Sequence, residues 1–164
     1  MDFKVRTVYD DDKVIKLQVW DPAYLHHSYF KGVHGILIVY DISDHISFEG
    51  IESWLSQIKA HDHALASQIL VGNKSDLSSK RAVTALRALE FAGTNQLRFI
   101  ETSANDGINI ESVFLALVRM VLLRSASSEQ STIVDSEICQ ICHGKACSCN
   151  YLVVSRQLCN ENDA

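Results

Sequence analysis

The chain has 164 residues, which is a usual length for one domain. Its composition, with 47% hydrophobic and 21% charged residues, is that of a soluble globular protein and excludes a disordered or membrane-spanning chain. A net charge of −5 argues against nucleic acid as a partner, and because the residues after Met1 do not resemble a signal peptide, we expect a cytoplasmic protein.

The first two predicted elements are the strands of a hairpin. Apolar and charged residues alternate over residues 3–8, an acidic break follows, and the alternation resumes over residues 14–20. Two such runs joined by a short turn predict an antiparallel pair.

Three further strands are predicted from apolar runs at residues 35–40, 69–72 and 97–100. The first two runs are continuously apolar, which is typical of strands that helices cover on both faces. Apolar residues at helical spacing predict three helices between and after these strands. These residues are Phe48, Ile51, Leu55 and Ile58, then Val83, Leu86 and Leu89, and then Ile110, Val113, Phe114, Leu117, Val118 and Val121. The alternation of strands and helices predicts an α/β fold with a mostly parallel sheet.

The helical pattern ends near residue 124, and a polar stretch follows it. We therefore expect a folded domain over residues 1–124 and a flexible tail over residues 125–164. All five cysteines lie in this tail, between Cys139 and Cys159. An odd number of cysteines at one end of a chain without a secretion signal argues against a disulfide framework.

Polar residues follow four of the predicted strands, at the point where each strand ends. They are Asp21, Asp41, residues 73–76 and residues 101–104. Because ligands bind at the carboxyl ends of the strands in such sheets, we expect the binding site at this edge.

The segment Asn73-Lys74-Ser75-Asp76 has the chemistry to recognise guanine. A carboxylate accepts two parallel hydrogen bonds, and guanine offers such a pair in its ring N1–H and exocyclic amine. Adenine would leave the same carboxylate unpaired, which is costly in a buried site. Asp76 suits this role. Asn73 can bond the other edge of the base or brace neighbouring loops, while the stem of Lys74 can lie flat along the ring.

These residues carry a resemblance to a known family. Asn73-Lys74-Ser75-Asp76 matches the N-K-x-D guanine motif of the Ras-superfamily GTPases, and Thr102-Ser103-Ala104 matches their second base-binding loop. The segments DFKVRTV, IKLQVWD, YFKGVHGILIVYDISDHISF and ILVGNKSDL look like the Rab branch. The resemblance covers the chain from Asp2 to about Leu123.

The resemblance implies a fold with a Ras-like P-loop GTPase sheet. It also implies a protein that binds GTP or GDP with Mg²⁺, hydrolyses GTP and directs membrane traffic through Rab effectors and regulators. Ser103 and Ala104 would lie beside the guanine, with the backbone N–H of Ala104 facing its carbonyl oxygen. We expect a monomer that is cytoplasmic and peripheral on intracellular membranes only if it is lipidated.

Asp21 resembles the family's magnesium ligand, which acts through a water molecule. In the family this strand ends D-x-x-G-Q, where the glycine senses the γ-phosphate and the glutamine orients the attacking water. Here Asp21-Pro22-Ala23 keeps the start, but the segment that leads to Gly32 is several residues shorter than in a Rab. Neither the glycine nor the glutamine can be placed, so switch II is shortened and we assign no catalytic residue.

The family's phosphate loop, G-x-x-x-x-G-K-[ST], does not occur in this sequence. By resemblance, the sequence starts after the first strand, the phosphate loop, the first helix and the switch threonine, as a truncated gene product would. Losing about five charge-assisted hydrogen bonds of roughly 1.5–3 kcal/mol each removes on the order of 10 kcal/mol of interaction. We therefore do not expect tight GTP binding by this chain, and GTP hydrolysis stays open.

The missing first strand lies centrally in the Ras-like sheet, between the strand that ends at Asp21 and the strand that ends at Asp41. Without it, two interior strand edges lose their hydrogen-bond partner. Three outcomes are open: the hairpin shifts to close the gap, another segment fills the gap, or the chain is a fragment. We favour an incomplete gene model or a splice product, which explains the missing segments together.

The cysteine-rich segment, residues 139–149, admits three interpretations. Its four thiolates are the number that zinc needs, although their spacing is tight. Cys142-His143 completes a haem attachment pattern, which we attribute to chance. Cys147 and Cys149 form the C-x-C pattern that resembles the lipidated ending of Rab chains, but residues follow it, so we expect no lipidation. We favour a flexible tail without a function of its own.

Two classes of function follow from the residues and the resemblance. The first is a Rab-like small GTPase that binds guanine nucleotides, with a weaker variant that binds guanine and hydrolyses nothing. The alternative is a non-catalytic interaction protein that uses a Rab-like surface without a nucleotide switch.

Overall fold

The computed structural model describes residues 3–10, 13–20, 33–60, 66–127 and 152–158. Within them, a six-stranded sheet has the order β1-β2-β6-β3-β4-β5. Its strands are β1 (Phe3–Asp10), β2 (Lys13–Trp20), β3 (Gly35–Asp41), β4 (Ser67–Asn73), β5 (Arg98–Glu101) and β6 (Leu152–Leu158). The helices are α1 (His45–Glu49), α2 (Ile51–Ala60), the 3-10 helix η4 (Ser75–Lys80), α3 (Ala85–Thr94) and α4 (Ile110–Ser127).

The predicted hairpin and the predicted parallel strands are confirmed. Strands β1 and β2 pair antiparallel, with Phe3 opposite Trp20 and Asp10 opposite Lys13. Strands β3, β4 and β5 are parallel neighbours. The predicted α/β fold is therefore present, but the sheet as a whole is mixed.

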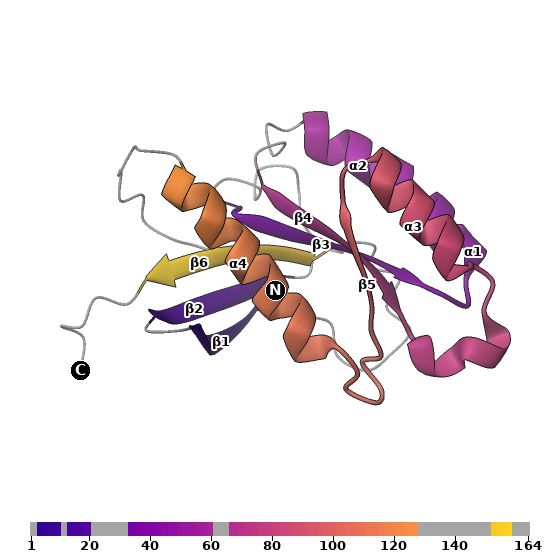
Figure 1. The fold of residues 1–164 in the computed structure, drawn as a ribbon, viewed down its shortest axis with the longest axis horizontal. Helices are drawn as coiled ribbons and strands as arrows, with labels where there is room; N and C mark the ends of the chain where they lie inside the picture. Colours follow the sequence, from indigo (N-terminus) through magenta and orange to yellow (C-terminus); the bar gives the residue numbers. More distant parts are fainter. Residues whose placement is uncertain (1–2, 11–12, 21–32, 61–65, 128–151, 159–164) are drawn as a thin grey trace.

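Strand β6 fills the position between β2 and β3, and it is antiparallel to both (Figure 1). This is the second of the three outcomes foreseen for the missing central strand. β6 lies within residues 125–164, where the sequence predicts a flexible tail. A strand forms there because β2 and β3 would otherwise each present an unpaired backbone edge in the interior of the sheet.

Helices cover both faces of the sheet, as the continuously apolar strands predict. On one face, α4 packs against β2, β3 and β4, and the buried residues of this core include Leu17, Leu37 and Leu117. On the other face, α1, α2 and α3 pack against β3 and β4 around Ile38, Tyr40 and Phe48. Figure 1 shows α4 crossing the sheet at one side and α1, α2 and α3 grouped at the opposite side.

The predicted apolar face formed by Val83, Leu86 and Leu89 is confirmed at Val83, which is fully buried, and is wrong at the two leucines. Leu86 and Leu89 are 66% and 57% exposed, whereas Ala88 and Ala92 are fully buried. Small residues face the sheet, and the partly buried Phe91 fills space beside them. The prediction from helical spacing selected the larger leucines, whereas the alanines Ala88 and Ala92 pack in the core.

None of the described helices is both long enough and apolar enough to cross a membrane.

Candidate functional site

Two loops at the carboxyl ends of β4 and β5 form the centre of the site. The Thr102 N–H donates to the Gly72 carbonyl at 2.9 Å, and the Ser75 N–H donates to the Thr102 carbonyl at 3.0 Å. These backbone bonds continue the pairing of the parallel strands beyond their ends. As a result, residues 73–76 and residues 102–104 lie side by side, as the sequence predicts.

Asn73 bridges the two loops through its side chain. Its Oδ1 accepts a hydrogen bond from the Thr102 hydroxyl at 3.2 Å and another from the Ala104 N–H at 3.1 Å. Thr102 is buried, whereas Ala104 is exposed, so the bridge reaches from the interior to the surface. The bracing role that the sequence predicts for Asn73 is thus present. A guanine carbonyl placed at Ala104 would share this N–H with Asn73.

Asp76 is held by a serine from the other loop. The fully buried Ser103 donates its hydroxyl to Asp76 Oδ1 at 2.6 Å, and its oxygen accepts the Asp106 N–H at 3.0 Å. Within the described residues no hydrogen bond to Asp76 Oδ2 is present, and a carboxylate oxygen has lone pairs for more than one donor. The carboxylate therefore has a fixed position and spare capacity to accept two further hydrogen bonds.

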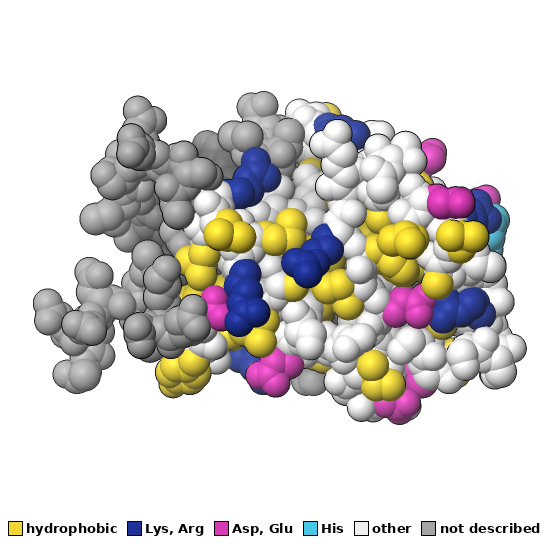
Figure 2. All heavy atoms as spheres, viewed as in Figure 1, with side chains coloured by type: hydrophobic (Ala, Val, Ile, Leu, Met, Phe, Trp, Pro, Cys, Tyr) yellow, Lys and Arg dark blue, Asp and Glu magenta, His cyan; other side chains and the backbone are white. Residues whose placement is uncertain are grey.

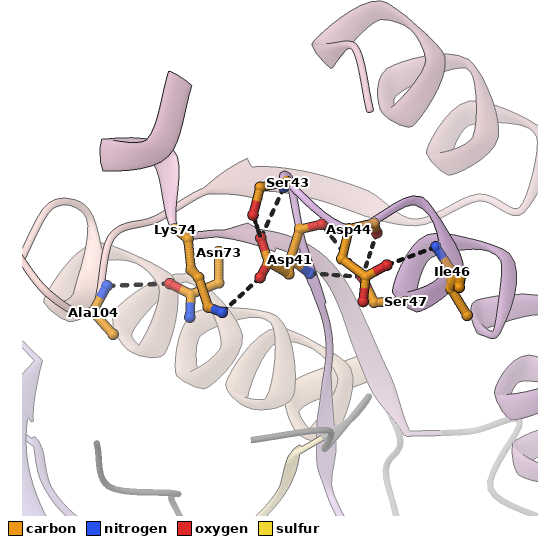
Figure 3. A network of polar contacts seen from close by, with 8 residues as sticks. All are labelled: Asp41, Ser43, Asp44, Ile46, Ser47, Asn73, Lys74 and Ala104. Carbon is orange, nitrogen blue, oxygen red and sulfur yellow. Dashed lines mark hydrogen bonds and ion pairs between the residues drawn. The ribbon is translucent and has the colours of Figure 1, made fainter. Parts of the chain in front are cut away.

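Lys74 lies next to Asn73 and reaches the end of β3. Its backbone is left-handed, with φ 64° and ψ 40°. Its ammonium pairs with Asp41 Oδ2 at 2.6 Å. Figure 3 shows Lys74 and Asn73 side by side, with the Asn73 amide directed to Ala104 and the Lys74 ammonium directed to Asp41. The lysine stem is thereby fixed at the mouth of the two loops.

Asp41 is oriented by its own turn. Ser43 donates to Asp41 Oδ1 from its backbone N–H at 2.8 Å and from its hydroxyl at 2.6 Å. Burial raises the pKa of Asp41, but the hydrogen bonds from Lys74 and Ser43 outweigh burial and hold the pKa below its ordinary value of 3.8. Asp41 is therefore a carboxylate at neutral pH.

A second ion pair ties the same two loops together farther from the centre. Arg81, which follows η4, contacts Glu101 at the end of β5 through two hydrogen bonds of 2.6 and 3.0 Å. Hydrogen bonding to Glu101 raises the pKa of Arg81. Glu101 directly precedes Thr102, so the pair fixes the base of the second loop.

The roles of Asp41, Arg81 and Glu101 were not predicted from the sequence. The sequence placed Asp41 at a strand end on the expected binding edge, and the structure adds that Asp41 is the partner of Asn73 in the parallel register of β3 and β4. Glu101 begins the polar segment 101–104 that the sequence placed at the binding edge, but no signal pointed to its partner Arg81, 20 residues away.

The remaining predicted site residues cannot be compared with the structure. Asp21, Cys147 and Cys149 lie outside the described residues. Over the described ranges, no group of three or more His, Cys, Asp or Glu side chains is arranged to hold a metal ion.

Comparisons with known proteins identify the family of the chain. Residues 1–123 match the Ras family. The chain is 42% identical over 137 residues to GTP-binding protein YPT1 of Saccharomyces cerevisiae, which covers 80% of this chain and 66% of that protein. It is 44% identical over 133 residues to Ras-related protein RABD2a of Arabidopsis thaliana, which covers 77% of this chain and 66% of the relative.

A further relative aligns over a longer part of the chain. Ras-related protein Rab-13 of Rattus norvegicus is 38% identical over 159 residues, or 90% of this chain and 78% of the relative. The chain thus spans about two thirds of the length of YPT1 and RABD2a and somewhat more of Rab-13. From the family match and these identities, the chain belongs to the Rab branch of the Ras-superfamily small GTPases.

Proposed function

We propose that this chain binds guanine nucleotides through the base, using Asp76, Asn73, Lys74, Ser103 and Ala104. The observation that carries the proposal is the Ser103–Asp76 hydrogen bond of 2.6 Å. It holds a carboxylate at the meeting point of the two loops and leaves it able to accept two parallel donors. The phrase GTP-binding in the name of the relative YPT1 is consistent with such a ligand.

Selectivity for guanine over adenine follows from the donors that each base presents. Guanine offers two N–H groups to the Asp76 carboxylate, whereas adenine presents a ring acceptor that would face the negative charge. A site that hydrogen-bonds a substrate group discriminates strongly against a ligand that lacks this group. We therefore expect a clear preference for GDP over ADP.

Affinity is expected to be low, because the sequence contains no phosphate loop. Base contacts alone support a dissociation constant on the order of 0.1–1 mM, which corresponds to about 4–5.5 kcal/mol. The family's Mg²⁺ would be held on the phosphate side, with Asp21 as a water-mediated ligand. Effector binding and a part in vesicle traffic on intracellular membranes belong to the same proposal. GTP hydrolysis does not, because the sequence contains neither the phosphate loop nor an assignable catalytic glutamine.

The proposal is tested by calorimetric titration of the full chain with GDP and with ADP. We expect binding of GDP, weaker or undetectable binding of ADP, and loss of the preference in Asp76→Asn. Asp106→Asn is the matched control, because it removes a charge from an exposed side chain near the same loop. Equal affinity of the unchanged chain for GDP and ADP would refute the proposal.

One observation favours the alternative, a non-catalytic interaction protein. Strand β6 completes the sheet between β2 and β3. A sheet completed in this way does not depend on nucleotide for its hydrogen bonding. In that case the unfolding temperature of the nucleotide-free chain would be unchanged by millimolar GDP, whereas binding raises it by mass action.

A further inference from the structure

The contact between Lys74 and Asp41 joins the base-binding motif to a strand that the motif does not include. The Lys74 ammonium lies 2.6 Å from Asp41 Oδ2, and Asp41 is the residue opposite Asn73 in the parallel register of β3 and β4. The carboxylate is 20% exposed and the lysine side chain 43% exposed, so the pair lies at the border of the interior.

The carboxylate of Asp41 is divided between two partners. Both hydrogen bonds from Ser43 go to Oδ1, and the ammonium of Lys74 takes Oδ2. The Asp41 backbone is fixed as well, because its N–H donates to the Ser47 hydroxyl at 3.0 Å (Figure 3). The turn after β3 thus presents one immobile oxygen to the lysine.

We propose that Asp41, oriented by Ser43, is a positioning residue for Lys74: it holds the lysine stem extended so that the stem forms a preformed wall for the guanine ring. This inference rests on the proposed guanine binding and adds to it a residue outside the two base-binding loops.

The physical basis is the entropy of a long side chain. A free lysine loses its rotamer freedom when a ligand packs against it, and the loss weakens binding. Here the ion pair fixes the rotamers of Lys74 before any ligand arrives. The left-handed backbone at Lys74, which costs a residue with a Cβ some free energy, directs the stem from the loop toward Asp41. The anchored ammonium leaves the methylene groups available to a flat apolar surface.

A purely structural role for the same ion pair makes a different prediction. If Asp41 only stabilises the turn after β3, its replacement would weaken GDP binding whatever residue occupies position 74. If Asp41 acts through the Lys74 ammonium, its replacement has an effect only while that ammonium is present. A double-mutant cycle distinguishes the two roles.

The experiment measures GDP affinity by calorimetry on the full chain and on Asp41→Asn, Lys74→Met and the double variant. Methionine keeps an unbranched apolar stem and removes the charge. We expect Asp41→Asn to weaken GDP binding roughly three- to tenfold, the factor that corresponds to immobilising one long side chain. In the Lys74→Met background the same replacement should change the affinity less than about twofold.

Asp44→Asn is the matched control. Asp44 lies three positions farther along the same turn and caps α1 by accepting the Ile46 N–H, and asparagine keeps such a cap. Its GDP affinity should equal that of the unchanged chain. Ser43→Ala keeps the carboxylate and removes one of its anchors, so it should weaken binding in the same direction but less. It also replaces Asp41→Asn in the cycle if that variant does not fold.

Each result decides between the hypotheses. A loss of affinity at position 41 that disappears in the Lys74→Met background supports the positioning role. A loss that persists in that background, or no loss at all, overturns it and leaves the proposed guanine binding intact. Absence of GDP preference in the unchanged chain overturns both.

Discussion

Gly72 directly precedes the base-binding motif, and because it has no side chain, its backbone can lie close to the Tyr40 ring. Replacing Gly72 by alanine tests how closely the core is packed under the site. A Cβ built at position 72 would lie 2.8 Å from the Tyr40 hydroxyl oxygen and 3.1 Å from Ile42 Cγ2. Tyr40 is 2% exposed, and its neighbours leave little room for the ring to move. The added methyl group must therefore displace the tyrosine or the strand.

The Tyr40 hydroxyl is the group closest to the added methyl, so its removal is the second substitution of the test. It is buried and has no hydrogen-bond partner among the described residues. Burial, together with the nearby negative charge of Glu101, raises the pKa of Tyr40, so the hydroxyl stays neutral. Tyr40→Phe removes this unsatisfied group and keeps the edge contact with the Phe48 ring, whose centroid lies 5.0 Å away.

The magnitudes follow from the contacts. Overpacking a well-packed core costs about 1–3 kcal/mol, so Gly72→Ala should lower the free energy of unfolding by about 2–3 kcal/mol, near the top of this range. Tyr40→Phe alone should raise it by about 1 kcal/mol, because a buried unpaired hydroxyl is costly. In the Tyr40→Phe background, Gly72→Ala should cost only about 1 kcal/mol, since the closest contact is gone.

Urea unfolding followed by circular dichroism measures all four proteins of this cycle. For two residues in contact, the expected coupling of about 1–2 kcal/mol is well above the error of additivity. Additive effects would show that the hydroxyl is not the atom that excludes a side chain at position 72. A destabilised Tyr40→Phe variant would show that the hydroxyl has a partner, and either result would refute the reasoning.

Three further predictions test other supports of the site. Arg81→Met removes both hydrogen bonds to Glu101 and should lower the free energy of unfolding, measured in urea, by about 1–2 kcal/mol. Lys80 is adjacent and exposed, so the control Lys80→Met should change this free energy by less than about 0.5 kcal/mol. Equal effects of the two variants would contradict the role of the ion pair. Deleting residues 152–158 removes the partner of β2 and β3, and we expect the shortened chain to aggregate in size-exclusion chromatography. An elution volume and unfolding curve equal to those of the unchanged chain would contradict this prediction. The lowered pKa of Asp41 contributes stability that is present above its ordinary value of 3.8 and is lost as the pH falls through the lower, folded-state pKa. In urea unfolding, Asp41→Asn should therefore lose less stability below about pH 4 than the unchanged chain does. Parallel pH profiles of the two proteins would contradict this assignment.

The sequence predicted those parts of the fold that depend on local patterns. The hairpin follows from alternation over residues 3–8 and 14–20, and β3 and β4 follow from continuous apolar runs. Strand β6 was not predicted, because its formation depends on the two open edges beside it and not on a pattern of its own. The buried face of α3 was also missed, since the sheet, and not hydrophobicity alone, decides that Ala88 and Ala92 lie inside.

The candidate site divides in the same way. Asn73, Asp76, Ser103 and Ala104 were predicted because they occur in short motifs at the ends of strands. Apart from the bracing role of Asn73, the contacts that hold them were not predicted, because each joins segments that only the assembled sheet brings together. The bridge from Asp76 to Ser103 spans 27 positions, and the bridge from Arg81 to Glu101 spans 20. Side-chain reach and strand register decide such contacts, and neither can be read from spacing alone.

The residues proposed to contact the guanine base are held by contacts among themselves and with neighbouring strands. Selectivity for guanine over adenine can therefore be considered separately from the affinity for the whole nucleotide. The contacts described for Asn73, Lys74 and Asp76 come from β3, β4, β5 and the loops that follow them. The proposed guanine recognition therefore needs only the residues of this part of the nucleotide site, whereas tight binding of a nucleotide would need contacts to the phosphates as well. Because the two depend on different residues, the ratio of GDP to ADP affinity measures the geometry of the base site even when both affinities are low. A chain with an intact base site would keep this ratio high at millimolar dissociation constants.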